Sequence, residues 1–228
     1  MGIIKTKEEI EKLRKAALLG DRCFEHICKF IKPGMTEIQI AKEIDDFFVK
    51  NGASGSSFDT IVGAGKNSAQ IHSTPTEYVI QNQDIILLDF GCVLDGYCSD
   101  MSRTIFVGSP TDKQKEVYKL VQDAHYNATK KIRIKDVAKK ADEYGRKNIQ
   151  EAGYDYAHAL GHGVGVEVHE KPLISYRSEE ILEEDMVFTI EPGIYIENEF
   201  GVRIEDTGVL MQNGVELFSK SSREIIIL

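Results

Sequence analysis

The sequence predicts an α+β fold made of two similar halves, which pack about a pseudo-twofold axis and share one curved mixed sheet with helices on its outer face. Helical stripes and short apolar runs follow one another in the same order twice along the chain. Each half also carries an acid-x-Gly turn after an apolar run, namely Asp89-Phe-Gly91 and Glu191-Pro-Gly193. No low-complexity linker separates the halves, so we expect one domain over residues 1–228, with pseudo-repeats at about 1–108 and 109–228.

In the first half, capping boxes and apolar runs predict two helices and three strands. Thr6-x-x-Glu9 is a capping box that opens a helix, which is expected to run to about Lys32. A second box, Thr36-x-x-Gln39, opens a helix that ends at Asn51-Gly52. The predicted strands cover residues 58–63, 84–91 and 96–107.

The second half repeats this order. Thr111-x-x-Gln114 opens a third helix, and a fourth is predicted over residues 135–152. The remaining expected elements are strands at 164–169, 186–196 and 202–211, a hairpin turn at Asn213-Gly214 and a short last strand, Glu224–Leu228. The turn around Lys130–Asp136 lacks the Pro-Gly of its counterpart, Pro33-Gly34, so we expect it to be several residues shorter.

Composition and charge exclude several classes of protein. With 42% hydrophobic and 29% charged residues, the 228-residue chain is typical of a globular protein and not of a disordered one. Its 28 basic and 37 acidic residues give a net charge of −9, which argues against binding to nucleic acid or to an anionic membrane. No apolar run approaches the ~20 residues of a membrane helix. The four cysteines lack C-x-x-C spacing and are typical of a reduced, cytoplasmic protein.

Four acidic residues lie within or directly after apolar strands, and they are Asp89, Asp100, Glu191 and Glu205. Any one of them, taken alone, is more often a strand-end residue that faces water. Four on a repeated pattern indicate carboxylates that converge inside the fold, where they would repel one another unless cations neutralise them. Two divalent ions would balance four carboxylate charges, so the sequence predicts a site for a metal pair.

Histidines add further candidate site residues. His162 and His169 belong to the glycine-rich stretch Gly161–Glu170, where glycines would let the backbone approach a metal closely. His158 lies four residues before His162. His72 lies at the end of the segment Val62–His72, which follows from the predicted strand over residues 58–63. The chain contains neither the H-E-x-x-H motif of zinc peptidases nor the G-x-S-x-G motif of serine hydrolases.

Four ordered motifs resemble those of a known family. They are Asp89-Phe-Gly-x4-Gly96-Tyr-x-Ser-Asp100-x-x-Arg103-Thr, Gly161-His-Gly-Val-Gly-x-Glu-Val-His169-Glu, Thr189-Ile-Glu-Pro-Gly-Ile-Tyr195 and Gly201-Val-Arg-Ile-Glu-Asp206. Together they are similar to the catalytic domain of Xaa-Pro aminopeptidases and Xaa-Pro dipeptidases, which belong to the pita-bread metallopeptidases. The resemblance covers nearly the whole chain and implies the pita-bread fold.

The resemblance also implies a role for each candidate residue. The positions that match the five ligands of a dinuclear metal site are Asp89, Asp100, His162, Glu191 and Glu205. Asp100 and Glu205 match the two ligands that bridge both ions. The histidines that match substrate-orienting and proton-moving positions are His72, His158 and His169, and Arg203 matches an arginine beside the metal carboxylates.

The chemistry that this site would perform is peptide hydrolysis. An oxygen-rich site with one imidazole favours Mn²⁺, with Co²⁺ or Zn²⁺ able to replace it. Paired ions lower the pKa of a bridging water, and the resulting hydroxide would attack the scissile carbonyl. We expect Glu191 to act as the general base, and His169 or His72 to support the oxyanion. The expected substrate is a peptide with proline at its second position, cleaved at the N-terminal Xaa-Pro bond, and the preferred peptide length is open.

Two other functions stay open at this point. Methionine aminopeptidases have the same fold and metals, but the arginines of Ser99–Arg103 and Gly201–Asp206 resemble the proline-directed branch. A noncatalytic partner-binding relative would typically have lost ligands, and here all five remain. Full-length family members usually carry a domain before the catalytic one, which we expect to be absent here, through shortening or as a naturally short form. This expected absence leaves the oligomeric state, including a homodimer, open.

Overall fold

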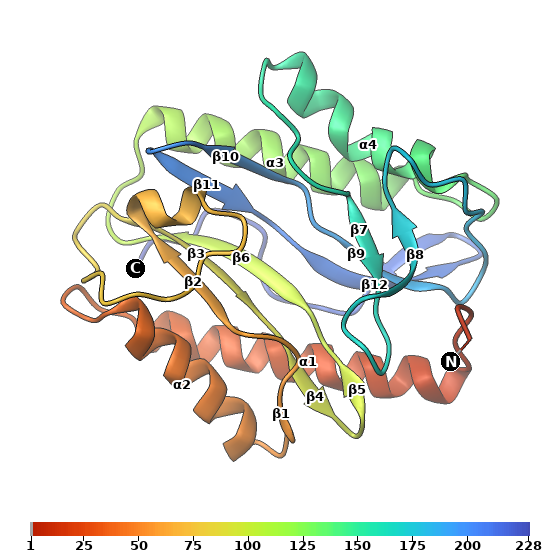
Figure 1. Ribbon diagram of the computed structural model, residues 1–228, viewed down its shortest axis with the longest axis horizontal. Helices are drawn as coiled ribbons and strands as arrows, with labels where there is room; N and C mark the ends of the chain where they lie inside the picture. Colours follow the sequence, from red (N-terminus) through yellow and green to blue (C-terminus); the bar gives the residue numbers. More distant parts are fainter. Residues whose placement is uncertain (1) are drawn as a thin grey trace.

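The computed structural model describes residues 2–228 and arranges them as two α+β halves, with the strands between two pairs of helices (Figure 1). The helices are α1 (Lys7–Phe30) and α2 (Glu37–Lys50) in the first half, and α3 (Asp112–Lys131) and α4 (Ala138–Glu151) in the second. The capping boxes predicted at Thr6, Thr36 and Thr111 are all formed, so these three helices begin where the sequence placed them.

The strands fall into two sets, one for each half. The first half contains β1 (Gly55–Ser56), β2 (Ile61–Ala64), the short 3₁₀ helix η1 (Gly65–Ala69), β3 (Ile85–Phe90), β4 (Cys92–Leu94), β5 (Tyr97–Cys98) and β6 (Met101–Phe106). The second contains β7 (Gly161–Gly163), β8 (Glu170–Ile174), β9 (Val187–Ile190), β10 (Gly193–Ile196), β11 (Phe200–Arg203), β12 (Asp206–Met211) and β13 (Gly214–Leu217).

The predicted fold class is confirmed, and the pairing of the strands adds detail to it. The strands form four sheets, with the orders β2-β3-β6, β1-β4-β5, β13-β12-β9-β7-β8 and β10-β11. Every ladder between these strands is antiparallel. The shared sheet that the sequence predicted is therefore divided into separate antiparallel parts.

Three predicted strands are each broken in two at an acidic residue. The run 96–107 is divided at Ser99-Asp100, the run 186–196 at Glu191-Pro192, and the run 202–211 at Ile204-Glu205. Apolar runs alone do not show where a ladder stops. At each break the backbone leaves the sheet, and the acidic side chain at that point lines a cavity.

The segment 164–169 is not the strand that the sequence predicted. It is a loop between β7 and β8, whose ladder shifts register between His162 and Gly163. A Cβ on Gly163 would lie 2.1 Å from the carbonyl oxygen of Lys171, and one on Gly165 would lie 2.3 Å from the carboxylate of Glu170. Close packing against the backbone therefore requires Gly163, and a tight loop carries His169.

The predictions for the first and the last strand along the chain were also inexact. The first strand, predicted over 58–63, begins only at Ile61. The predicted strand Glu224–Leu228 is reduced to one isolated bridge between Ile227 and Phe106. A single bridge gives little ladder to hold a strand, although the segment still packs beside β6.

The two halves share the same turn between their helices, which corrects one expectation. The Gly34 amide donates to the carbonyl of Ile80, and the Lys135 amide donates to the carbonyl of Leu182 in the same way. Gly34 has φ +94° and Lys135 has φ +72°, so the lysine adopts the left-handed conformation without a glycine. The turn around Lys130–Asp136 is therefore not shorter than its counterpart. Its conformation is set by these hydrogen bonds and does not need a Pro-Gly sequence.

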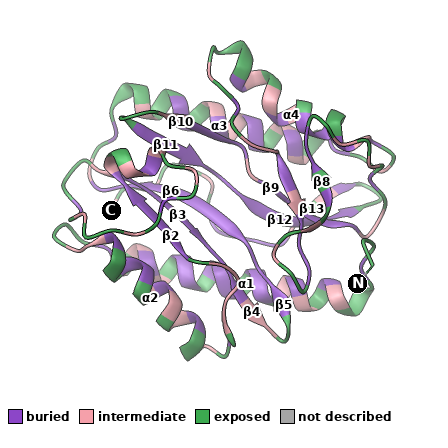
Figure 2. Ribbon diagram, viewed as in Figure 1, coloured by how far each residue is buried: buried purple, intermediate pink, exposed green. Residues whose placement is uncertain are grey.

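Each half has its own hydrophobic core between its helices and its strands (Figure 2). Phe24 and Leu88 belong to the core of the first half, and Val121 and Phe188 to that of the second. Burial of these apolar side chains holds each pair of helices against the strands of its half. Among residues 2–228, no helix has the length and apolar character that crossing a membrane requires.

Side chains join the halves where β6 meets β11 and β12. The hydroxyl of Thr104 donates to the carbonyl of Arg203 (2.9 Å) and accepts from its amide (3.1 Å). The Glu205 amide donates to the carbonyl of Ser102 (3.1 Å). This junction places the segment that carries Asp100 next to the one that carries Glu205.

Candidate active site

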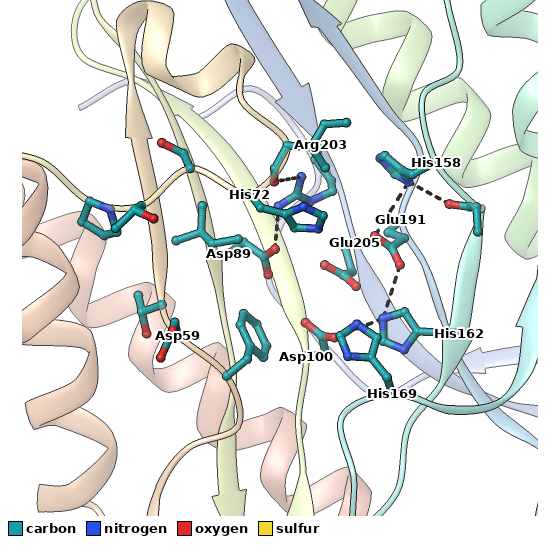
Figure 3. Close-up of a pocket in the computed structure, with 18 residues that line it drawn as sticks. Asp59, His72, Asp89, Asp100, His158, His162, His169, Glu191, Arg203 and Glu205 are labelled. Atoms are coloured by element: carbon teal, nitrogen blue, oxygen red, sulfur yellow. Dashed lines mark hydrogen bonds and ion pairs between the residues drawn. The ribbon is translucent and has the colours of Figure 1, made fainter.

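A cavity of about 560 Å³ lies between the two halves (Figure 3). All nine residues that the sequence singled out line it: Asp89, Asp100, His162, Glu191, Glu205, His72, His158, His169 and Arg203. They come from both halves of the chain and from strand ends, breaks and loops. The broken strands described above thus deliver side chains of distant segments to one place.

His162 points one ring nitrogen at the carboxylates. Its Nδ1 donates to the carbonyl of Gly163 (3.1 Å), which leaves the Nε2 lone pair free. Nε2 lies 3.5 Å from an oxygen of Asp100 and 3.4 Å from an oxygen of Glu191. Burial lowers the pKa of His162 to about 4, so the imidazole is neutral. A lone pair that faces carboxylate oxygens is the arrangement of a metal ligand.

The carboxylates themselves fit a bound cation. One ligand atom each from Asp100, His162 and Glu205 lies within 4.8 Å of the others. Burial, followed by repulsion from neighbouring carboxylates, raises the pKa of Asp100 and of Glu205 well above their usual range. Among residues 2–228, no group donates a hydrogen bond to Asp89 Oδ1, although this oxygen is buried. Buried acids that repel one another and an unpartnered oxygen are a donor set suited to divalent ions.

Removing metal is therefore expected to lower the melting temperature, most strongly at the upper end of the range from pH 6.5 to 8. In the metal-free fold, the pKa values of Asp100, Glu191 and Glu205 are raised by burial, so their contribution to stability is lost as the pH rises through the folded values. For Glu191 the folded pKa is about 8. Thermal unfolding in excess chelator would measure the effect.

The histidines set the lower limit of this pH window. The folded pKa values of His158 and His162 are about 4, below their usual 6.5, so their contribution grows as the pH rises and is complete above 6.5. Above pH 6.5, of these groups only the three acids still change the stability with pH, so the melting temperature of the metal-free protein should fall as the pH rises. The Mn²⁺-loaded protein is the control. If the metal-free protein melted at one temperature across the window, the acids would be solvated instead of clustered.

Arg203 connects the carboxylates to His158 through a tyrosine. Its Nη2 donates to Asp89 Oδ2 (2.5 Å), and its Nη1 donates to the hydroxyl of Tyr195 (2.6 Å). That hydroxyl lies 2.9 Å from His158 Nε2 and, since Nδ1 of His158 donates to the carbonyl of Ala159, the tyrosine is the donor. Tyr195 was part of a quoted motif, but no role was predicted for it.

The two remaining histidines lie at the solvent side of the cavity. His72 and His169 are both exposed, as groups that meet a substrate need to be. The ring of His169 lies beside that of His162, with 4.2 Å between centroids. The loop that carries it is fixed at Glu170, whose carboxylate pairs with Lys5 at 2.5 Å.

Sequence reasoning did not find a second group of residues that lines the cavity. This group includes Phe58, Asp59, Thr60, Ile61, Ile71 and Pro75. It is partly apolar and can accommodate a side chain of a peptide. The only signal was the predicted strand over residues 58–63, which does not show on which side of the fold its residues lie.

Arg103, quoted in the first motif, does not line the cavity. It is buried behind Glu205, where its Nη2 donates to Asp206 Oδ1 (2.7 Å) and its Nη1 donates to the carbonyl of Glu205 (2.6 Å). Arg103 therefore supports the backbone of a candidate ligand instead of meeting a substrate.

Comparison with known proteins agrees with this geometry. Residues 11–212 match the model of metallopeptidase family M24. A Xaa-Pro dipeptidase of Pyrococcus furiosus is 42% identical over 226 residues, which is 98% of this chain and 65% of the relative. An uncharacterized peptidase of Bacillus subtilis, YqhT, is 45% identical and covers 99% of this chain.

Solved structures give the same result. A Xaa-Pro dipeptidase from Bacillus anthracis superposes with a TM-score of 0.98 at 45% identity, over 99% of this chain and 64% of the other. An X-Pro aminopeptidase from Thermotoga maritima superposes with a TM-score of 0.97 at 40% identity, over 99% of this chain and 65% of the other. The chain thus spans about 65% of the length of the curated relatives that it matches.

Proposed function

This chain belongs to metallopeptidase family M24, and from that premise we propose that it is a dinuclear-metal peptidase that hydrolyses the Xaa-Pro bond at the N-terminus of peptides. Membership in the family implies divalent metal ions. The observation that carries the proposal is the convergence of buried carboxylates and one neutral imidazole in the cavity. The names of similar proteins support the substrate class, since they include both dipeptidases and an aminopeptidase for Xaa-Pro peptides.

We assign the metal pair to the side chains of Asp89, Asp100, His162, Glu191 and Glu205. Asp100 and Glu205 are the bridging ligands in this assignment, as the resemblance of the motifs implies, and one oxygen of each lies within 4.8 Å of the other and of a ring nitrogen of His162. The oxygen-rich donor set favours Mn²⁺, with Co²⁺ or Zn²⁺ as substitutes. When bound, such a pair polarises a carbonyl and lowers the pKa of water enough to supply hydroxide near neutral pH.

Glu191 is the proposed general base. Its Oε1 accepts from the hydroxyl of Thr189 (3.2 Å), which holds the carboxylate at the break after β9. Burial raises the pKa of Glu191 to about 8 in the metal-free fold, and bound cations would lower this pKa, so that the carboxylate would be ionised and able to accept a proton near neutral pH. Part of its side chain remains open to the cavity, where a proton from water could reach it.

The histidines are proposed to bind and orient the peptide. Neutral His158 accepts from Tyr195 and keeps its ring in the cavity wall, while His72 and His169 offer ring nitrogens at the solvent side. Hydrogen bonds from such groups to a developing oxyanion stabilise the transition state more than the substrate.

His169→Ala is accordingly expected to lower kcat by about a hundredfold, the usual effect of losing one oxyanion donor. Metal content should stay unchanged, because His169 is not a ligand in this assignment. Steady-state kinetics and elemental analysis of the same preparation measure both quantities. His26→Ala is the matched control and should change neither, because His26 is a half-buried histidine that packs between α1 and α2, outside the cavity. A variant that lost its metal, or kept full turnover, would show that His169 has a different role.

Proline selectivity is proposed to come from a site that has no hydrogen-bond acceptor for the amide hydrogen of the scissile bond. The nitrogen of an Xaa-Pro bond carries no N–H, and its ring is rigid. The cavity also has apolar lining residues, among them Phe58, Ile61 and Pro75, and these can accommodate a ring.

A peptide panel tests the proposed function. Xaa-Pro dipeptides, Xaa-Pro-Yaa peptides and Met-Ala-Yaa peptides would be assayed with added Mn²⁺. We expect cleavage of the proline peptides and little of Met-Ala-Yaa. The reverse pattern would replace the assignment with that of a methionine aminopeptidase, and no cleavage by metal-loaded protein would favour a noncatalytic partner-binding role.

We further propose that residues 1–228 act as one catalytic domain. The four cysteines are free in the structure, which supports a reducing, cytoplasmic location. A homodimer stays a prediction that light scattering of the purified chain can test.

A further inference from the structure

Glu37, the first residue of α2, is a buried acid for which the proposed chemistry has no role. Its side chain is fully buried, and its carboxylate accepts four hydrogen bonds. Oε1 accepts from the amide of Ala64 (2.7 Å) and from Asn67 Nδ2 (3.0 Å). Oε2 accepts from the amide (2.9 Å) and the hydroxyl (2.6 Å) of Thr76. One carboxylate thus holds both ends of the segment 64–76.

That segment carries His72 into the cavity. On its inner side it is attached to the second half, because Ser68 Oγ accepts from the Gly201 amide (2.9 Å) and the Ile71 carbonyl accepts from Arg203 Nη1 (3.2 Å). No hydrogen bond or ion pair between residues 2–228 holds the His72 ring itself. The place of the ring therefore depends on the backbone of segment 64–76, and on its outer side Glu37 fixes that backbone.

We propose that Glu37 is a positioning residue for His72. Its carboxylate closes the segment 64–76 into a fixed loop and so sets where the imidazole meets a peptide. The proposal rests on the proposed function for the role of His72, but the closing of the loop is independent of any substrate.

Helix capping does not account for this acid. A glutamate in the first turn interacts favourably with the helix dipole, but Thr36 and Gln39 already form the capping box of α2. An interaction with the dipole needs no bond to a distant segment, whereas both oxygens of Glu37 accept hydrogen bonds from segment 64–76. The hydrogen bonds point to the loop as the reason for the residue.

The second half holds a histidine segment in a comparable way with different residues. Ala138 takes the place of Glu37 at the start of α4. One turn later, the buried carboxylate of Asp142 accepts from the Leu160 amide (3.0 Å), and Arg146 donates to the carbonyl of His158 (3.2 Å). In both halves, the second helix therefore uses a buried acid to hold the segment that brings a histidine to the cavity.

Glu37→Gln tests the proposal without substrate. The amide nitrogen of glutamine cannot accept, so the bonds from one end of the segment are lost while size is kept. Hydrogen exchange followed by mass spectrometry should show amides of 64–76 exchanging at least about tenfold faster, since bonds to a charged acceptor are the stronger ones. Segment 138–160 should be unchanged. The matched control is Asp136→Asn, a buried acid of the equivalent turn that accepts from Arg133 and Lys140 and holds no site segment.

Kinetics then separate positioning from general stability. With metal content unchanged, Glu37→Gln should lower kcat/KM for an Xaa-Pro peptide about tenfold, and Asp136→Asn should not lower it. When His72 is already replaced by alanine, adding Glu37→Gln should lower kcat/KM by less than about twofold further, because its effect passes through His72.

Losses that multiply in the double variant, or exchange in 64–76 that matches the wild type, would overturn the proposal. Thr76→Val gives a second test if Glu37→Gln does not fold. It removes the hydroxyl that donates to Glu37 and that also accepts from Asn67 Nδ2 and the Tyr78 amide, and it should show the same local exchange and the same dependence on His72. If the wild type cleaves no peptide, the proposed function fails, while the exchange result still decides whether Glu37 holds the loop.

Discussion

Replacing Glu205 with alanine is expected to empty both metal positions and to lower kcat/KM by at least about a thousandfold. The proposed pair would lose a bridging carboxylate, and metal ions contribute several kcal/mol of transition-state stabilisation, where each 1.36 kcal/mol is a factor of ten. Elemental analysis after Mn²⁺ loading and turnover of an Xaa-Pro peptide measure the two effects. Glu205 is buried and accepts from the Ser102 hydroxyl (2.6 Å), so its carboxylate has one defined orientation.

The melting temperature gives a second reading of the same variant. Without metal, Glu205→Ala removes one of the mutually repelling acids, so added Mn²⁺ should raise its melting temperature far less than it raises that of the wild type. Glu199→Ala, an exposed acid in the turn between β10 and β11, is the control and should behave as the wild type. An alanine variant at position 205 that still bound two ions and turned over normally would refute the bridging role.

Arg203→Met is expected to lower the free energy of unfolding by about 3–5 kcal/mol, the usual result of removing one partner of a buried ion pair. Arg203 is 2% exposed, and the substitution leaves Asp89 Oδ2 without its donor among carboxylates that already repel one another. It also removes the donor to Tyr195 and therefore loosens His158. Urea unfolding of the metal-free variant, in excess chelator, measures the loss against the wild type under the same conditions.

The arginine series separates charge from geometry. Arg203→Lys keeps the positive charge but lacks the planar fork that reaches Asp89 and Tyr195 together, so its stability should fall between the wild type and the methionine variant. Arg177→Met, at an exposed arginine, should change the free energy of unfolding by less than about 0.5 kcal/mol. A loss of similar size at Arg203 would show that the buried pair with Asp89 contributes nothing.

Local signals predicted the helices well, because their information lies within a few residues. The boxes at Thr6, Thr36 and Thr111 define helix starts from a hydroxyl and a side chain three residues later. The fourth helix has no such cap at Val137 and was predicted to start too early. Its true start follows Lys135, whose left-handed backbone is held by the distant carbonyl of Leu182.

The candidate site was predicted because its acids violate the apolar pattern around them. Asp100, Glu191 and Glu205 each stand where a predicted strand breaks, so the residues that signalled the site also caused the errors in the strands. The unpredicted parts depend on contacts distant in sequence. Glu37 meets Thr76 only when α2 packs beside β2, and Phe58 reaches the cavity only through the turn before β2.

Diffraction from crystals of the wild-type chain loaded with Mn²⁺, recorded at the manganese absorption edge, tests the dinuclear site most directly. We predict two anomalous peaks in the cavity, ~3.5–4 Å apart, with Asp100 and Glu205 in contact with both ions. A single peak at saturating Mn²⁺, or peaks only outside the cavity, would contradict the assignment of a metal pair to these five residues.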